Sequence, residues 1–285
     1  GDFHAVAAAH NLAAAMVDNH LNHGNPLGLE PGSIGWPRVA DVNDRVLRDA
    51  VVGLGGRQNG PVRETEWVIT AASEVMAVLS LADDLADLRR RLGRIVVGRR
   101  RQGAPVALEE LRAAGAMAVL LREAVKPNLL QTLEGSPVLV HAGPFGNIAQ
   151  GTSSVIADRL ALRLAEVVVT EAGFGADLGA EKLFDVKCRQ SGLRPAAAVV
   201  VATVRALRAH GGAGRGRTGK ELEAARAAPD LAAVRIGCEN LRIQVENVLR
   251  FGVPAVVAVN ARDGDAPAEH AAAREAALAA GARAA

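Results

Sequence analysis

The segment from residue 167 to 212 constrains the fold more than any other part of the chain. An apolar, β-branched run at residues 167–170 leads directly into a turn that contains Gly173, Gly175 and Gly179. A charged helical segment follows, and then a second apolar run at residues 198–204. This order predicts a parallel βαβ unit, which presents backbone N–H groups at the carboxyl edge of a sheet. Because phosphates and carboxylates bind at such edges, we expect a small-molecule site that takes a nucleotide.

The rest of the chain alternates between the two kinds of periodicity. Helical spacing of apolar residues predicts helices over residues 4–21, 39–50, 69–81, 83–92, 147–165, 231–251 and 266–280, and one helix or two joined near Gly115 over residues 108–125. Short apolar runs predict strands over residues 51–56, 95–97, 138–141 and 254–260. This alternation predicts an α/β fold, with a doubly wound parallel sheet flanked by helices. The Gly/Arg stretch at residues 211–219 predicts a boundary between domains 1–212 and 213–285.

Composition excludes several classes of function. Five Phe, two Trp and no Tyr leave few aromatic platforms for stacked bases, and the net charge is only +2, which argues against nucleic acid as a partner. No apolar run approaches the ~20 residues that cross a bilayer, which argues against a membrane protein. Cys188 and Cys238 have no CxxC spacing and suit a reducing compartment. We therefore expect a cytoplasmic protein.

Several blocks of sequence resemble one family. TEAGFGADLGAEKLFDVKCR and VATVRALRAHGG, which lie between residues 170 and 212, are similar to distinctive segments of the formate–tetrahydrofolate ligase family. So are GDFHA, VADVNDRVLRDAVVGLGG, ASEVM, KPNLLQTLE and HAGPFGNIAQG, which occur in the family's order over nearly the whole chain. The resemblance implies a P-loop-NTPase-like sheet and ATP-dependent ligation of formate to tetrahydrofolate through formyl phosphate. It also implies ATP, Mg²⁺ and a monovalent cation (K⁺ or NH₄⁺) as cofactors, and a homotetramer.

The resemblance covers the central part of the family's sequence. Both ends of the chain look cut, and the family's phosphate-binding loop with its lysine is expected before Gly1. A long C-terminal portion is expected after Ala285. We therefore interpret the chain as a fragment, which we expect to be inactive as a ligase by itself.

The same resemblance carries roles to particular positions. It implies catalytic positions around formyl phosphate at Phe174, Gly175, Gly146, Asn147 and Arg205. It implies cofactor or substrate binding at Gly173, Gly179, Asn260 and Arg262, and a monovalent-cation ligand at Asp2. Lys187 closely follows the glycine turn, and we interpret it as a cofactor-binding residue whose ammonium balances phosphate charge. From the residues alone, other interpretations stay open. The glycine turn is also explained as a plain strand-to-helix turn, Lys187 as a surface or ion-paired residue, and Asp2 as a helix cap.

Two positions depart from the family pattern. Gln150 stands where the family typically has His, which removes the option of carrying a proton, so we assign no acid–base role there. Arg262 stands where a Phe typically stacks on the pterin. A guanidinium also stacks on flat rings, but the substitution puts folate affinity in question.

Two other functions compete with the ligase. A degenerate homologue that serves as a scaffold is compatible with these departures. A nicotinamide-dependent oxidoreductase would use the glycine turn, but the strand predicted at residues 198–204 has no acidic residue to hold a ribose. Residues 214–221 nearly spell a second phosphate loop, yet Glu221 replaces the hydroxyl residue that helps to hold magnesium, so a linker is favoured.

Overall fold

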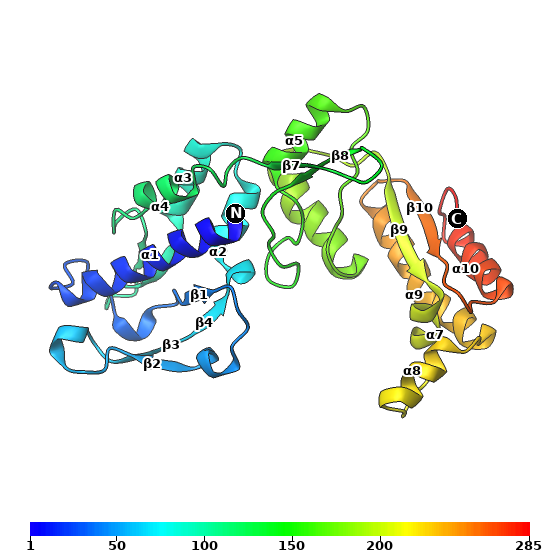
Figure 1. The fold of residues 1–285 in the computed structure, drawn as a ribbon, viewed down its shortest axis with the longest axis horizontal. Coiled ribbons are helices and arrows are strands. Elements are labelled where there is room, and N and C mark those ends of the chain that lie inside the picture. Colours follow the sequence, from blue (N-terminus) through cyan, green and yellow to red (C-terminus); the bar gives the residue numbers. More distant parts are fainter. The chain divides into compact units, whose positions relative to one another are not determined.

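The computed structural model describes all residues from 1 to 285, and the chain forms two compact units (Figure 1). The first unit contains Gly1–Phe174 and Asp185–Ser191, and the second contains Gly175–Phe184 and Gly192–Ala285. Residue 212, where the sequence predicts a domain boundary, lies within the second unit in the turn after its first α-helix. The division into domains 1–212 and 213–285 stays a prediction. No helix combines the length and the apolar character needed to cross a membrane.

The first unit is mainly helical. Its helices are α1 (Asp2–Asn22), α2 (Glu74–Leu81), α3 (Leu85–Arg94), α4 (Ala114–Leu121), α5 (Val155–Leu164) and the short α6 (Arg189–Ser191). Apolar side chains of α1 to α4 form its core, with Val6, Val17, Leu79, Leu88 and Met117 among the fully buried members. Side chains cap three of these helices: Ser73 accepts from Val75 N at α2, Asp84 from Asp87 N at α3, and Ser154 from Ala157 N at α5.

The strands of the first unit form separate two-stranded ladders. They are β1 (Arg38–Ala40), β2 (Ala50–Val52), β3 (Arg63–Thr65), β4 (Trp67–Ile69), β5 (Val96–Arg99), β6 (Pro105–Ala107), β7 (Asn128–Gln131) and β8 (Pro137–Val140). The β1–β4 pair is parallel, whereas β2–β3, β5–β6 and β7–β8 are antiparallel. The prediction of one continuous parallel sheet is therefore wrong for this chain, although its mixed α/β character is confirmed. Short connections explain the three antiparallel pairs, because they return β3, β6 and β8 beside the preceding strand and leave no room for a crossover helix.

The second unit places two parallel strands against helices. It contains β9 (Ala198–Thr203), α7 (Val204–His210), α8 (Gly219–Ala227), α9 (Leu231–Arg250), β10 (Ala255–Asn260) and α10 (Pro267–Ala279). Pairing of β9 with β10 runs in register from Ala198 opposite Ala255 to Thr203 opposite Asn260. One face of this pair is buried through Val200 and Val257, while Val199 and Val201 on the other face are exposed. The predicted parallel arrangement of these two strands is confirmed.

The predictions fail where local pattern and tertiary pairing disagree. Residues 39–50 form the end of β1, a 3₁₀ turn (Arg45–Arg48) and the start of β2 in place of a helix. Helices α4 and α5 are shorter than predicted, and α5 begins only at Val155, because the preceding Gly151 adopts a φ of +60° that a helix does not accept.

Residues 167–170, the run that most strongly suggested a strand, belong to no ladder. Val167 and Val169 are 78% and 92% exposed. A strand exists only where a neighbour accepts its backbone hydrogen bonds, and β-branched composition supplies the preference but not the neighbour. The strand predicted here is absent. The charged segment that follows is helical as predicted, but much of it (Ala176–Ala180 and Leu183–Cys188) is π-helical.

Candidate functional site

Two glycine-containing turns meet in the first unit. The Gly173 N–H donates to the Gly151 carbonyl over 2.9 Å. A methyl group placed on Gly146 would lie 2.8 Å from Cδ2 of Phe174 and 3.4 Å from the Gly173 carbonyl oxygen. One placed on Gly173 would lie 2.8 Å from the Gly151 oxygen. These backbones are thus in contact at positions that accept no side chain. The turn after β8 and the turn at residues 173–174 converge, although residues 167–170 form no strand and β8 pairs antiparallel with β7, so the contact does not arise from neighbouring ends of a parallel sheet.

Phe174 is held in an unusual conformation at this contact. Its φ is +68°, a region that bulky residues rarely adopt, and its side chain is 66% exposed. An exposed apolar ring on a left-handed backbone gains little from burial, so its conformation must be imposed by the turn on either side. Such strain is characteristic of ligand-binding positions. Asn147 lies close by in sequence and is exposed, whereas Gly146 is buried.

A buried histidine anchors the start of the first turn. His141 follows β8 and is 2% exposed. Its Nδ1 lies 2.6 Å from Ser154 Oγ, and its Nε2 lies 2.6 Å from the Ala124 carbonyl oxygen. A carbonyl only accepts, so Nε2 carries a proton and donates to Ala124, while Nδ1 is paired with the serine hydroxyl. His141 therefore joins the end of β8, the cap of α5 and the chain after α4.

A second histidine repeats this arrangement. His10 of α1 contacts Ser73, the cap of α2, at 2.8 Å and the Pro37 carbonyl at 2.9 Å, and its ring stacks on Trp36 at 4.1 Å. Burial lowers the pKa of His10 to about 4, although the hydrogen bond to Pro37 opposes this shift. The sequence analysis did not single out His10, Ser73 or Ser154. A serine directly before a helical run was the available signal.

Asp2 is tied to the same turn. Its Oδ2 accepts from the Ala142 N–H over 2.9 Å, at a residue whose φ is +57°. Asp2 is the first residue of α1, and the helix cap Gly1 makes no side-chain cap bond. The interpretation of Asp2 as a cap of its own helix is therefore replaced by a long-range tether to the turn.

Gln150 is also part of this turn and points into the protein. It is 2% exposed, and its Nε2 donates to the Ser80 hydroxyl on α2. Ser80 is fully buried, and its hydroxyl donates in turn to the Ala77 carbonyl over 2.8 Å. No sequence pattern links positions 80 and 150, so this pair was not predicted.

Lys187 is neither exposed nor free. Its Nζ lies 2.5 Å from Asp158 Oδ2 on α5, and Lys187 is 1% exposed. Nζ makes no hydrogen bond of acceptable angle, so the contact is an ion pair without good hydrogen-bond geometry. Burial raises the pKa of Asp158 even though the Lys187 ammonium acts to lower it. The ion-paired interpretation of Lys187 is the one that the structure supports.

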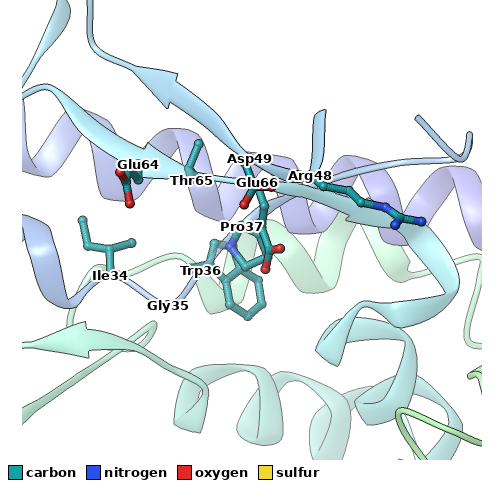
Figure 2. Close-up of a pocket in the computed structure, with 9 residues that line it drawn as sticks. All are labelled: Ile34, Gly35, Trp36, Pro37, Arg48, Asp49, Glu64, Thr65 and Glu66. Carbon is teal, nitrogen blue, oxygen red and sulfur yellow. The ribbon is translucent and has the colours of Figure 1, made fainter. Parts of the chain in front are cut away.

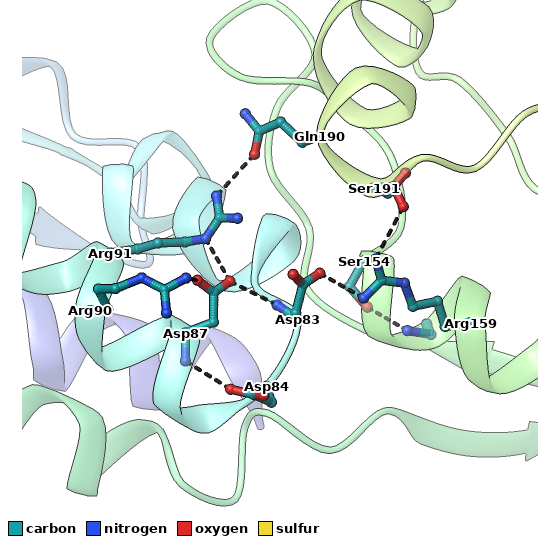
Figure 3. A network of polar contacts seen from close by, with 10 residues as sticks. Asp83, Asp84, Asp87, Arg90, Arg91, Ser154, Arg159, Gln190 and Ser191 are labelled. Carbon is teal, nitrogen blue, oxygen red and sulfur yellow. Dashed lines mark hydrogen bonds and ion pairs between the residues drawn. The ribbon is translucent and has the colours of Figure 1, made fainter.

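The segment Asp185–Ser191 is held on the first unit by further polar contacts (Figure 3). Arg91 Nη1 donates to Gln190 Oε1 over 2.9 Å, and Arg159 Nη2 donates to the Ser191 carbonyl over 3.0 Å. The two arginines are fixed by acidic partners, since Arg91 Nε pairs with Asp87 at 2.7 Å and Arg159 Nη1 pairs with Asp83 at 2.7 Å. Three arginines of α3 thus form ion pairs with acidic side chains, Arg89 with Glu109 and Arg90 and Arg91 with Asp87, which is typical of a structural surface.

The remaining predicted residues belong to the second unit, which is described by itself. Gly175 and Gly179 lie before and within the π-helical turn Ala176–Ala180. Arg205, on α7, forms an ion pair with Glu223 of α8. Asn260 ends β10 and Arg262 follows it, and both are exposed. Asn260 and Arg262 therefore share the carboxyl edge of the β9–β10 pair, where a parallel sheet offers a ligand site.

A buried ionic network supports that edge. Arg208 of α7 donates to both carboxylate oxygens of Glu269, over 2.8 and 2.5 Å, and lies 3.2 Å from Asp265. Glu269 also accepts from Asp230 N and Ala266 N, over 2.8 and 2.9 Å. The hydrogen bonds from Arg208 lower the pKa of Glu269 to about 2. This network joins α7, the cap of α9 and the start of α10, and no local sequence pattern predicts it.

Two cavities lie away from the glycine turns. One of about 250 Å³ in the first unit is lined by Trp36, Pro37, Arg48, Asp49, Glu64 and Glu66, among others (Figure 2). Another of about 390 Å³ in the second unit is lined by residues of the turn 212–217, by Ala225 of α8 and by residues 228–230 between α8 and α9. No group of three or more His, Cys, Asp or Glu side chains is arranged to hold a metal ion.

Comparisons with known proteins agree with the blocks of sequence. The family model of formate–tetrahydrofolate ligase matches residues 1–285. Formate–tetrahydrofolate ligase 3 of Rubrobacter xylanophilus is 60% identical over 283 residues, which cover 99% of this chain and 49% of that protein. The ligase of Saccharopolyspora erythraea is also 60% identical over 283 residues (99% and 50%), and that of Cereibacter sphaeroides is 61% identical over 269 (94% and 47%). The chain spans about half the length of these relatives. It belongs to the formate–tetrahydrofolate ligase family.

Proposed function

We propose that this chain is part of an ATP-dependent ligase that joins formate to tetrahydrofolate and yields 10-formyltetrahydrofolate. A formate oxygen attacks the γ-phosphorus of ATP, and the bond to the ADP oxygen breaks. N10 of the folate then attacks the carbon of formyl phosphate, loses its proton, and releases phosphate that keeps one formate oxygen. In-line phosphoryl transfer demands positioning and charge neutralisation more than covalent chemistry from the protein.

One observation carries the proposal in this chain: Gly146, Gly151, Gly173 and Phe174 are in contact. Small residues at a turn let a backbone approach an anionic acyl phosphate closely, and N–H groups at such turns stabilise its charge. The strained, exposed Phe174 ring beside them is a candidate wall of that pocket. We assign Asn147 to the same pocket, and a P-loop-NTPase-like sheet to the whole ligase. Gly175, which begins the second unit, stays a candidate formyl phosphate residue on the resemblance alone.

The other candidate residues receive different weights. Asn260 and Arg262 are proposed to bind tetrahydrofolate, with the Arg262 guanidinium stacking on the pterin. Arg205 would have to leave Glu223 before it could clamp an anion, and Lys187 would have to leave Asp158. We therefore propose Lys187 as a structural residue, although the sequence suggested phosphate binding.

The proposed cofactors fit the residues to different degrees. Mg²⁺ needs no cage of its own here, because it is commonly bound through substrate phosphates and one or two carboxylates. For the monovalent cation, Asp2 uses Oδ2 for Ala142 and keeps Oδ1. One oxygen does not complete a cation site, so no step is assigned to the cation, and Asp2 stays a candidate ligand. We further propose a homotetramer in the cytoplasm, which suits the two free cysteines.

Labelled formate tests the proposal in a chain extended to the length of the relatives. We expect ATP-dependent formation of 10-formyltetrahydrofolate, with ¹⁸O passing from formate into phosphate. Replacing Phe174 with Ala should lower kcat/KM for formate at least tenfold, whereas Leu133→Ala, at a fully exposed position after β7, serves as the control. Residues 1–285 alone should form negligible product. Absence of label in phosphate would exclude formyl phosphate, and absence of product from the extended chain would favour the scaffold alternative.

A further inference from the structure

The turn at residues 142–153 has few apolar contacts to hold it. Phe145 and Ile148 on this turn are exposed. Its internal bonds are local, such as Ala149 N to the Phe145 carbonyl over 2.7 Å. Short loops with little buried surface open easily unless side chains fix them. The position of Gly146 and Gly151 must therefore depend on specific tethers.

Two tethers adjoin the glycine contact. The Phe145 N–H, directly before Gly146, donates to the Ala71 carbonyl over 3.3 Å, and the only one of the two that a side chain provides is Gln150. It immediately precedes Gly151, whose carbonyl accepts the Gly173 N–H. The Gln150 side chain is buried and its amide nitrogen donates to Ser80 Oγ. The Ser80 hydroxyl donates its proton to the Ala77 carbonyl, so the Ser80 oxygen acts only as an acceptor towards residue 150. Only a side chain that offers an N–H or O–H at this point satisfies the buried hydroxyl.

We propose that Gln150 is a positioning residue, which sets the place of the Gly151 carbonyl and of Gly146 through its hydrogen bond to Ser80. The consequence for catalysis rests on the proposed ligase function. A neutral amide does not titrate near neutral pH, so the tether holds the turn without transferring a proton. Residue 150 acts through geometry, and a histidine that donates the same N–H does the same work.

Kinetics of the extended ligase test this assignment. Gln150→Ala should lower kcat/KM for formate by about tenfold to a hundredfold, because a misplaced turn weakens alignment of the reacting atoms. The KM for ATP should change less than about twofold. Ser80→Ala should give a similar loss, and the double variant should lose no more than the larger single loss, since both remove one contact. Gln131→Ala, at an exposed glutamine on β7, is the matched control.

Two further measurements separate positioning from chemistry and from instability. Gln150→His should recover activity with the same pH profile as the parent, and a new ionisation in that profile would overturn the proposal. Hydrogen exchange of the amides at 142–153 should accelerate in Gln150→Ala and Ser80→Ala of residues 1–285, while the α1 amides stay protected. Unchanged exchange in both variants would also overturn it. The hydrogen-exchange measurement needs no ligase activity. An inactive extended ligase would therefore refute the proposed function, whereas the exchange rates would still show whether Gln150 holds the turn.

Discussion

Replacing Glu269 with Gln should remove a large part of the stability of the second unit. Glu269 is fully buried and accepts four hydrogen bonds, two from Arg208 and one each from the Asp230 and Ala266 N–H groups. Arg208 holds the pKa of this carboxyl at about 2, against an ordinary value of 4.5. A shift of that size corresponds to about 3 kcal/mol, which agrees with the roughly 3–5 kcal/mol lost when one partner of a buried ion pair is removed.

Urea unfolding at pH 7, followed by circular dichroism, measures the change, and Glu239→Gln is the control because Glu239 pairs with Arg242 at the surface. The folded pKa of Glu269 is below its unfolded value, so its contribution is present in full above pH 4.5 and is lost as the pH falls towards 2. The difference in free energy of unfolding between the parent and Glu269→Gln should therefore shrink as the pH falls from 4.5 towards 2. A Glu269→Gln variant as stable as Glu239→Gln at pH 7 would refute this account of the network.

Three further perturbations have clear expected outcomes. Gly237→Ala should lower the free energy of unfolding of the second unit by about 2 kcal/mol or more, because the new methyl would collide with the Leu207 carbonyl. In most helices the same change is stabilising, and thermal melting measures the difference. Lys187→Met should cost about 3 kcal/mol, and adding Asp158→Leu should recover most of it, as a double-mutant cycle in urea would show. The pKa of His10 is lowered to about 4, so its contribution to the free energy of unfolding is full above pH 6.5 and falls by up to about 3 kcal/mol towards pH 4. His10→Gln should therefore flatten the pH dependence of urea unfolding between pH 6.5 and pH 4. The same pH dependence in parent and variant would contradict this expectation.

Local patterns were sufficient where an element depends on its own residues. The alanine-rich helix α1, the amphipathic α9 and the β9–β10 pair occur within a few residues of their predicted positions. The two glycine turns were also predictable, since glycines directly after an apolar run mark a place where the chain bends at a strand end. Their meeting at Gly146 and Phe174 was expected from neighbouring strand ends, but it occurs without the strand predicted at residues 167–170, so the contact agrees with the prediction while its stated cause does not.

Partners distant in sequence were not predictable. Residues 167–170 have the composition of a strand but no neighbour to pair with, so preference and outcome differ. Lys187 looked like a phosphate ligand because a positive charge follows a glycine turn, yet Asp158 takes that charge from 29 positions away. Arg208 and Glu269 are 61 residues apart, and neither side chain is marked by its neighbours as buried.

Position 150 illustrates how a departure from a family pattern is interpreted once its surroundings are known. By itself, Gln in place of His reads as loss of an acid–base group and favours a degenerate homologue. The buried Ser80 hydroxyl changes this interpretation, because it requires a donor at that point and does not require a proton that moves. An amide N–H and an imidazole N–H are equivalent for that purpose. If Gln150 positions the turn as proposed, its presence is compatible with catalysis. Arg262 is then the one departure from the family pattern that still favours the scaffold alternative.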